Sequence, residues 1–121
     1  MNEFDRPCIE SEAVNDLQVF LRAVADATRL RILCLLFDGE KSVCYLEERL
    51  GVSQPLVSHH LSVLRDVGLI RSRKSGTWSY YSLVPEAMFR LNQLFLRVLG
   101  AEKIPENYPF REECDELAVL K

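Results

Sequence analysis

Apolar residues are spaced as in α-helices in five stretches of the chain, which predicts five helices. These stretches are 11–24, 27–37, 43–50, 53–68 and 85–100. Between the last two, the period changes to the alternation of β-strands, at 69–74 and 78–83, and the Ser-Gly-Thr at 75–77 predicts a hairpin turn. Trp78 and Tyr80 share one face of the second strand, and we interpret both as packing residues.

The order of these elements, four helices, a hairpin and a final helix, predicts a winged helix-turn-helix fold that is mainly α with a small β-hairpin. Ser42 and Ser53 are placed to cap the two helices of the helix-turn-helix. The helix at 27–37 is apolar nearly all round. We therefore expect it to be the central buried helix, with Cys34 in the core.

The helix that begins after Ser53 has two different faces. Its apolar side carries Val57, Leu61 and Leu64, and we interpret His60, which lies beside them, as packed against the core. The opposite arc carries only short polar side chains and an imidazole: Gln54, Ser58, His59 and Ser62. Small neutral hydrogen-bonding groups suit a helix that lies against base edges in a DNA major groove. An ordinary amphipathic helix with a polar face would show the same pattern.

The length of 121 residues suits one domain, and the net charge of −3 is unevenly distributed along it. We divide the chain into a flexible N-terminal arm at 1–10, a winged helix-turn-helix domain at 11–100 and an acidic tail at 101–121. Residues 53–74 contain four basic residues and one acidic residue. Such a locally basic surface can contact phosphate groups although the whole chain is acidic.

The first and last predicted helices carry more apolar surface than a small domain can cover. The residues concerned are Phe20, Leu21, Phe89, Phe95, Leu96 and Leu99. Their surplus predicts a homodimer, which would also match the two-fold symmetry of many helix-turn-helix operators. The alternative is that the tail folds back over these residues.

No segment approaches the roughly 18 consecutive apolar residues that a membrane span needs, and the N-terminus is acidic. We therefore expect a cytoplasmic protein without a membrane partner. The four cysteines are widely spaced and include no Cys-x-x-Cys pair: Cys8, Cys34, Cys44 and Cys114. In the cytoplasm such thiols are expected to be reduced, so each is a packing residue, a ligand or a redox group.

Two runs of the chain resemble the ArsR/SmtB family of bacterial metal- and metalloid-responsive repressors. They are ADATRLRIL at 25–33 and SQPLVSHHLSVL at 53–64. The similarity extends from about residue 16 to residue 99 and leaves out the arm and the acidic tail. The resemblance implies a dimeric winged helix-turn-helix repressor that occupies double-stranded operator DNA without a cofactor and leaves it when an inducer binds.

Residue by residue, the resemblance places Gln54, Ser58 and His59 at the family's major-groove positions. Their chemistry agrees, because glutamine can pair with adenine through two hydrogen bonds and serine can donate or accept. Ser53 can both cap the helix and contact a phosphate. In the hairpin, four residues resemble the wing that contacts the DNA backbone or minor groove: Arg73, Lys74, Ser75 and Thr77.

Several family members carry Cys-Val-Cys where this chain has Ser-Val-Cys ending at Cys44, so one of the two thiols is missing. The last helix contains no His and no Asp, which argues against the zinc site that other members place there. Cys44 is nevertheless the best sensor candidate, because the first turn of a helix favours a thiolate. Cys8 on the arm and Cys114 on the tail are candidates for its partners.

Two chemistries fit such dispersed thiols. Three thiolates can bind a thiophilic ion such as As(III) or Sb(III) without any histidine, and we prefer this interpretation because Cys8 and Cys44 resemble family sites shared by the arm and the third helix. Alternatively, two cysteines form a disulfide or polysulfide link, as in family members that sense oxidants or reactive sulfur.

Function classes other than a repressor find less support in the sequence. The chain has no glycine-rich phosphate loop and no metal motif, and its only histidines, His59 and His60, are adjacent on one helix. We therefore expect no enzymatic activity. A winged-helix module that binds a protein and has no inducer is the more serious alternative, and a gel-shift assay with DNA distinguishes it.

Overall fold

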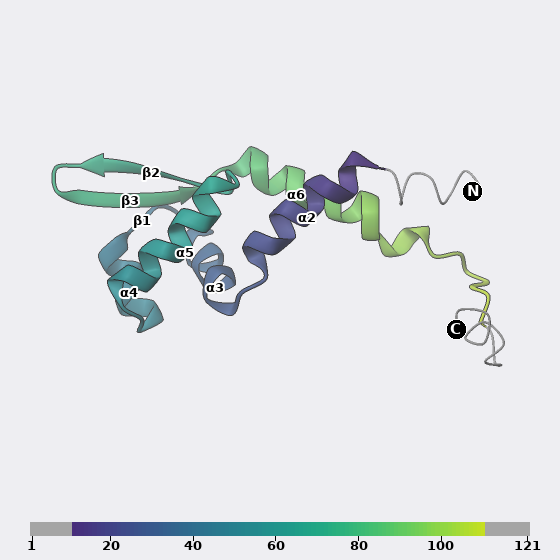
Figure 1. The fold of residues 1–121 in the computed structure, drawn as a ribbon, viewed down its shortest axis with the longest axis horizontal. Helices are drawn as coiled ribbons and strands as arrows, with labels where there is room; N and C mark the ends of the chain where they lie inside the picture. Colours follow the sequence, from purple (N-terminus) through teal and green to yellow (C-terminus); the bar gives the residue numbers. More distant parts are fainter. Residues whose placement is uncertain (1–10, 111–121) are drawn as a thin grey trace.

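The computed structural model describes residues 11–110 and confirms the winged helix-turn-helix fold. The helices are α2 (Glu12–Val24), α3 (Ala27–Leu36), α4 (Val43–Leu50), α5 (Gln54–Asp66), α6 (Pro85–Leu99) and a short 3₁₀ helix η1 (Ala101–Lys103), and the strands are β1 (Lys41–Ser42), β2 (Ile70–Ser75) and β3 (Trp78–Leu83). Figure 1 shows the β2–β3 hairpin projecting at one end of the molecule, while α2 and α6 lie side by side towards the other. In the part of the chain that the structure describes, no helix is long and apolar enough to cross a membrane.

Side-chain caps fix where four of the helices begin, as the sequence predicts for α4 and α5. Ser42 Oγ accepts a hydrogen bond from the backbone N–H of Tyr45, and Ser53 Oγ accepts one from that of Leu56. Such caps satisfy N–H groups that have no partner within the helix. Helix α4 ends at Gly51, whose φ of 67° lies in the left-handed region that favours glycine. The turn between α4 and α5 is therefore determined locally.

The sheet contains one strand more than the predicted hairpin. Strand β1 pairs antiparallel with β3, so that the strand order is β1-β3-β2. Ser42 lies opposite Tyr80 in this pairing and also caps α4. A strand of two residues leaves no periodic signal in the sequence, and only its partner strand defines it. The helix-turn-helix and the wing are thus joined through β1.

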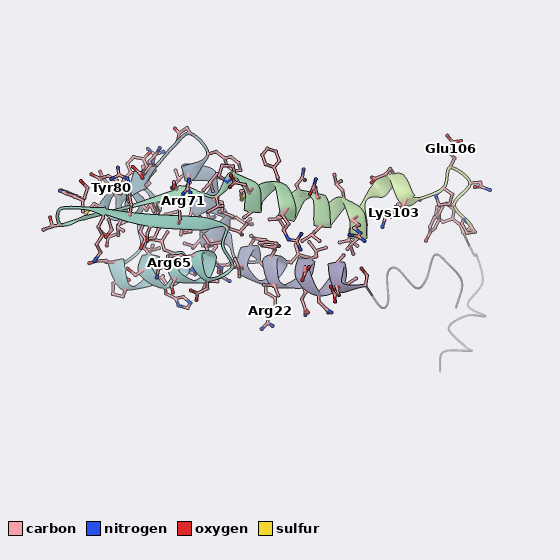
Figure 2. All side chains as sticks on the ribbon, turned by 90° about the horizontal axis from the view of Figure 1, so that it is seen from above. Arg22, Arg65, Arg71, Tyr80, Lys103 and Glu106 are labelled. Carbon is pink, nitrogen blue, oxygen red and sulfur yellow. The ribbon has the colours of Figure 1, made fainter. Side chains whose placement is uncertain are left out.

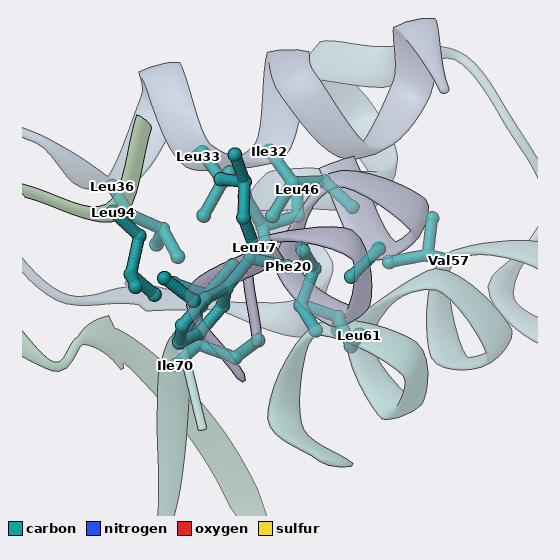
Figure 3. Packing of buried hydrophobic residues seen from close by; sticks show 14 residues of the cluster. Leu17, Phe20, Ile32, Leu33, Leu36, Leu46, Val57, Leu61, Ile70 and Leu94 are labelled. Atoms are coloured by element: carbon teal, nitrogen blue, oxygen red, sulfur yellow. The ribbon is translucent and has the colours of Figure 1, made fainter. Parts of the chain in front are cut away.

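The core lies where α3, α4 and α5 meet α2 and the start of β2 (Figure 3). Its fully buried side chains are Ile32, Leu46, Val57, Leu61, Leu64, Leu69 and Ile70. The prediction that Cys34 lies in this core is wrong, because Cys34 is exposed. Helix α3 buries one face only, and Leu30, Cys34 and Phe37 lie one turn apart on its exposed face.

Helices α2 and α6 present the apolar surface that predicted a homodimer, with one correction. Phe20 is buried in the core of its own chain. Four of the other predicted residues are exposed: Phe89, Phe95, Leu96 and Leu99. Phe89 and Phe37, with 70% and 65% of their surfaces exposed, also line an open apolar groove of about 680 Å³ beside α6. The homodimer stays a prediction.

The predicted arm at 1–10 lies outside the described residues, as does the part of the predicted tail at 111–121. Cys8 and Cys114 lie in these two segments. Residues 101–110 contain η1 and are exposed throughout. The division of the chain into arm, domain and tail stays a prediction.

Candidate nucleic-acid interface

Helix α5 presents to solvent the face that the sequence predicts for DNA. Its buried residues are Val57, His60, Leu61 and Leu64, so the interpretation of His60 as an inward-facing residue is confirmed. Gln54, Ser58 and His59 are exposed on the other side, and Ser53 is exposed at the N-terminus of the helix. Short polar side chains therefore line the accessible face over its first two turns, where a helix can enter a major groove.

The β2–β3 hairpin forms the wing, and its outer half is exposed from Arg71 to Trp78. The strands pair up to Ser75 and Trp78, so the turn consists of Gly76 and Thr77, one residue fewer than predicted. The interpretation of Trp78 as a packing residue is wrong, because 49% of its surface is exposed. Tyr80 is partly buried, and the Arg73 guanidinium carbon lies 4.8 Å from the centre of its ring.

Arg73 does not project freely into solvent, because it is held by an acidic residue that sequence reasoning missed. Its Nε and Nη2 donate to the two carboxylate oxygens of Glu40, at 2.8 and 2.6 Å. These hydrogen bonds hold the pKa of Glu40 below its usual range and raise the pKa of Arg73. Glu40 immediately precedes β1, so only the unpredicted strand brings it beside the wing.

We expect the Glu40→Gln substitution to raise the affinity for DNA of any sequence by about threefold to tenfold. The neutral side chain no longer competes with phosphate for Arg73, and the dependence of affinity on salt should steepen by roughly one counterion. Titrations of specific and random duplexes at several salt concentrations measure this. Glu48→Gln, at an exposed position on α4, removes the same charge without touching Arg73. Equal effects of both substitutions would contradict a specific role for Glu40.

Two further basic residues extend the wing surface towards α5. Arg65, in the last turn of α5, donates from Nη1 to Ser72 Oγ on β2 at 3.3 Å. Arg71 is exposed on the same strand. In Figure 2, Arg65, Arg71 and Tyr80 lie at one end of the molecule, far from Lys103. The local excess of basic residues in 53–74 was the signal for this surface, although it did not single out these two positions.

Cys44 occupies the position that the sequence predicts, in the first turn of α4, and its side chain is exposed. Helix α4 packs against α5, and the residue that caps α4 belongs to β1. Within residues 11–110 no group of three His, Cys, Asp or Glu side chains could hold a metal ion. The described part of the chain supplies Cys34 and Cys44 as free thiols. Because Cys8 and Cys114 lie outside the described residues, the three-thiolate site stays a prediction.

A helix-turn-helix whose second helix exposes short polar side chains, followed by a basic β-hairpin, defines a winged helix-turn-helix DNA-binding regulator. The chain belongs to the ArsR family. The family model described as "Bacterial regulatory protein, arsR family" matches residues 26–72, which span α3, α4, α5 and the start of β2. The resemblance drawn from the sequence is confirmed, and the chain is a transcriptional repressor of this family and not an enzyme.

Individual relatives support this membership over most of the described residues. The biofilm growth-associated repressor of Agrobacterium fabrum is 33% identical over 101 residues, which cover 84% of this chain and 86% of that repressor. The arsenical resistance operon repressor of Escherichia coli is 47% identical over 70 residues, 57% of this chain and 59% of that repressor. The structure of reduced HlyU from Vibrio cholerae matches with a TM-score of 0.63 and 36% identity, covering 74% of this chain and 95% of that chain.

Proposed function

We propose that this repressor occupies operator DNA as a homodimer in the cytoplasm and is released when thiolates centred on Cys44 bind a thiophilic inducer, As(III) or Sb(III). The observation that carries the proposal is the position of Cys44. It is an exposed thiol in the first turn of α4, the helix that packs directly against α5. A bond made at Cys44 therefore acts on the element next to the DNA-reading helix.

The DNA-binding half of the proposal assigns two roles to the interface residues. Gln54, Ser58 and His59 read base edges, because they are exposed on α5 and can donate or accept hydrogen bonds. The remaining residues contact the phosphate backbone or minor groove: Ser53, Arg73, Lys74, Ser75 and Thr77. Arg73 makes this contact in competition with Glu40, whose carboxylate accepts from its Nε and Nη2.

The Gln54→Ala substitution tests the base-reading role. We expect it to remove the preference at one base pair, which is worth about 1–3 kcal/mol, and to leave the affinity for random duplex unchanged. Lys74→Ala should instead weaken binding to all duplexes similarly and reduce the salt dependence by roughly one counterion. Anisotropy titrations of specific and random duplexes separate the two effects. Equal losses on both duplexes for Gln54→Ala would refute its base-reading role.

For the inducer, the proposal takes Cys44 as the central ligand and Cys8 and Cys114 as its partners. Trivalent arsenic and antimony are bound by soft thiolate ligands, and neither needs a histidine. The relative named as an arsenical resistance operon repressor supports a metalloid. The link from α4 through β1 to the wing strand β3 supports a mechanism in which both DNA-contacting elements respond to one site.

A second chemistry is favoured by one specific observation. The two thiols of the described residues, Cys34 and Cys44, are both free and exposed, as a sensor of oxidants or reactive sulfur requires. Treatment of the DNA complex with arsenite in one arm and with a persulfide donor in the other distinguishes the two. Release by the persulfide alone, with a sulfur bridge found by mass spectrometry, supports the second chemistry. A protein that binds no DNA at all would instead be an interaction module.

A further inference from the structure

A single polar side chain, His60, is buried in the apolar core formed by the described residues, where 7% of its surface is exposed. It belongs to α5 and lies on the side that faces the core, away from the side chains proposed to read DNA. A buried imidazole is costly unless its ring nitrogens find partners. The hydrogen-bond partners of His60 therefore indicate the role of this residue, because a leucine could fill the same space but could not form hydrogen bonds.

His60 is bound by Arg29, from the first turn of α3. The Nη1 of Arg29 lies 3.1 Å from the Nδ1 of His60. Because a guanidinium can only donate, Nδ1 is the acceptor and carries no proton. The carboxylate of Asp26, the N-cap of α3, lies 3.8 Å from the same nitrogen and accepts a hydrogen bond from the backbone N–H of Arg29 at 3.0 Å. That bond lowers the pKa of Asp26, so the carboxylate stays charged beside the guanidinium.

The same guanidinium also holds the end of α2. Its Nε donates to the backbone oxygen of Ala23, and its Nη2 donates to that of Arg22 at 3.4 Å. These carbonyls belong to the last turn of α2, where the helix itself provides no donors. Arg29 thus joins the end of α2, the start of α3 and the middle of α5, three helices that pack against one another.

We propose that Arg29 and His60 are positioning residues whose hydrogen bond fixes the rotation of α5 about its own axis relative to α2. The apolar contacts of α5 favour burial of one face without requiring a particular bond angle, whereas a hydrogen bond requires both distance and angle. A rotation of about 20° moves atoms on the helix surface by roughly 2 Å, which is enough to break hydrogen bonds to bases. The inference rests on the proposed DNA-reading role of α5.

Two substitutions of His60 differ in whether they keep the acceptor. In His60→Asn the side-chain oxygen takes the place of Nδ1, the same number of bonds from the backbone, and can accept from Arg29. In His60→Gln the amide lies one carbon further out, so the amide carbon, which cannot accept a hydrogen bond, takes the place of Nδ1. Arg29→Gln removes the guanidinium whose Nη1 donates to Nδ1, and its amide ends two bonds short of that atom. Arg31→Gln, at an exposed position of the same helix, removes a charge without touching His60.

The test measures the affinity of each variant for a duplex selected from a random pool by the wild-type protein, and its chemical unfolding in parallel. We expect His60→Gln and Arg29→Gln each to weaken specific binding by about tenfold or more, and the double variant to lose no more than either. His60→Asn and Arg31→Gln should stay within about threefold of wild type. Binding to random duplex should not distinguish His60→Asn from His60→Gln.

Three results would overturn the proposal. His60→Gln could bind as tightly as wild type under conditions where circular dichroism shows both folded. His60→Asn and His60→Gln could lose affinity equally while their unfolding midpoints agree. The losses could also simply follow the unfolded fraction, as a merely structural role requires. If Gln54→Ala changes base preference and His60→Gln changes nothing, only this inference fails; if Gln54→Ala changes nothing, the DNA-reading role of α5 fails.

Discussion

The Ser58→Glu substitution is expected to abolish specific operator binding, with an affinity loss of about a hundredfold or more. Ser58 lies one turn after Gln54 on the exposed face of α5, at the centre of the proposed interface. A carboxylate there enters a groove bordered by phosphates, where it meets like charges and loses water without gaining a partner. The position is exposed and glutamate is a good helix former, so the fold should be unaffected.

Fluorescence anisotropy at one stated salt concentration measures this loss, with circular dichroism as the check on folding. Asn15→Asp adds the same charge at an exposed position of α2, far from the proposed interface, and should change affinity by less than about twofold. An affinity of Ser58→Glu within about threefold of wild type would show that this face of α5 does not meet DNA.

The elements of this fold could be predicted because their signals are local. Ser42 and Ser53 cap helices with N–H groups three residues away, so the sequence around each cap contains both partners. The two faces of α5 follow from residues three and four apart, such as Val57 and Leu61 on the buried side. The place of Cys44 in the first turn of α4 follows from the same local reasoning, because Ser42 caps that helix.

The errors over Cys34 and Trp78 concern side chains whose surroundings are set by distant parts of the chain. Helix α3 is apolar nearly all round, so no periodicity shows which side the other helices cover, and Cys34 was assigned to the wrong one. Trp78 has the residue type of a packing position, but it lies next to the hairpin turn, beyond the reach of the core. Large size alone does not bury a residue.

The Arg73–Glu40 pair and the Arg29–His60 contact could not be predicted for the same reason. Each joins residues more than thirty positions apart. The Arg73–Glu40 pair depends on β1, a strand of two residues that forms only by pairing with β3. The second depends on how α2, α3 and α5 pack. Sequence reasoning placed His60 inside the core correctly, and only the structure shows that it is held there by a charged partner.

The Cys44→Ser substitution is expected to leave operator affinity close to that of wild type and to abolish release by arsenite. Cys44 is exposed and a hydroxyl group is similar in size to a thiol, so the substitution should not disturb the packing. Serine is also compatible with the first turn of a helix. It cannot supply the thiolate that As(III) requires. Titration of the DNA complex with arsenite measures release. The control is Cys34→Ser, which removes the other described thiol and should leave the operator at the same arsenite concentration as wild type.

The size of the effect follows from linkage. To move operator occupancy from nearly complete to nearly empty, an inducer has to bind the free protein about 10⁴-fold more tightly than the DNA complex, or about 5.5 kcal/mol. Linkage is reciprocal, so operator DNA must weaken arsenite binding by the same factor. For the wild type, the arsenite affinity measured with the duplex should therefore differ from that measured without it. For Cys44→Ser, the two affinities should not differ. Release by arsenite that survives Cys44→Ser would refute Cys44 as the central ligand and move the input of this repressor to another thiol.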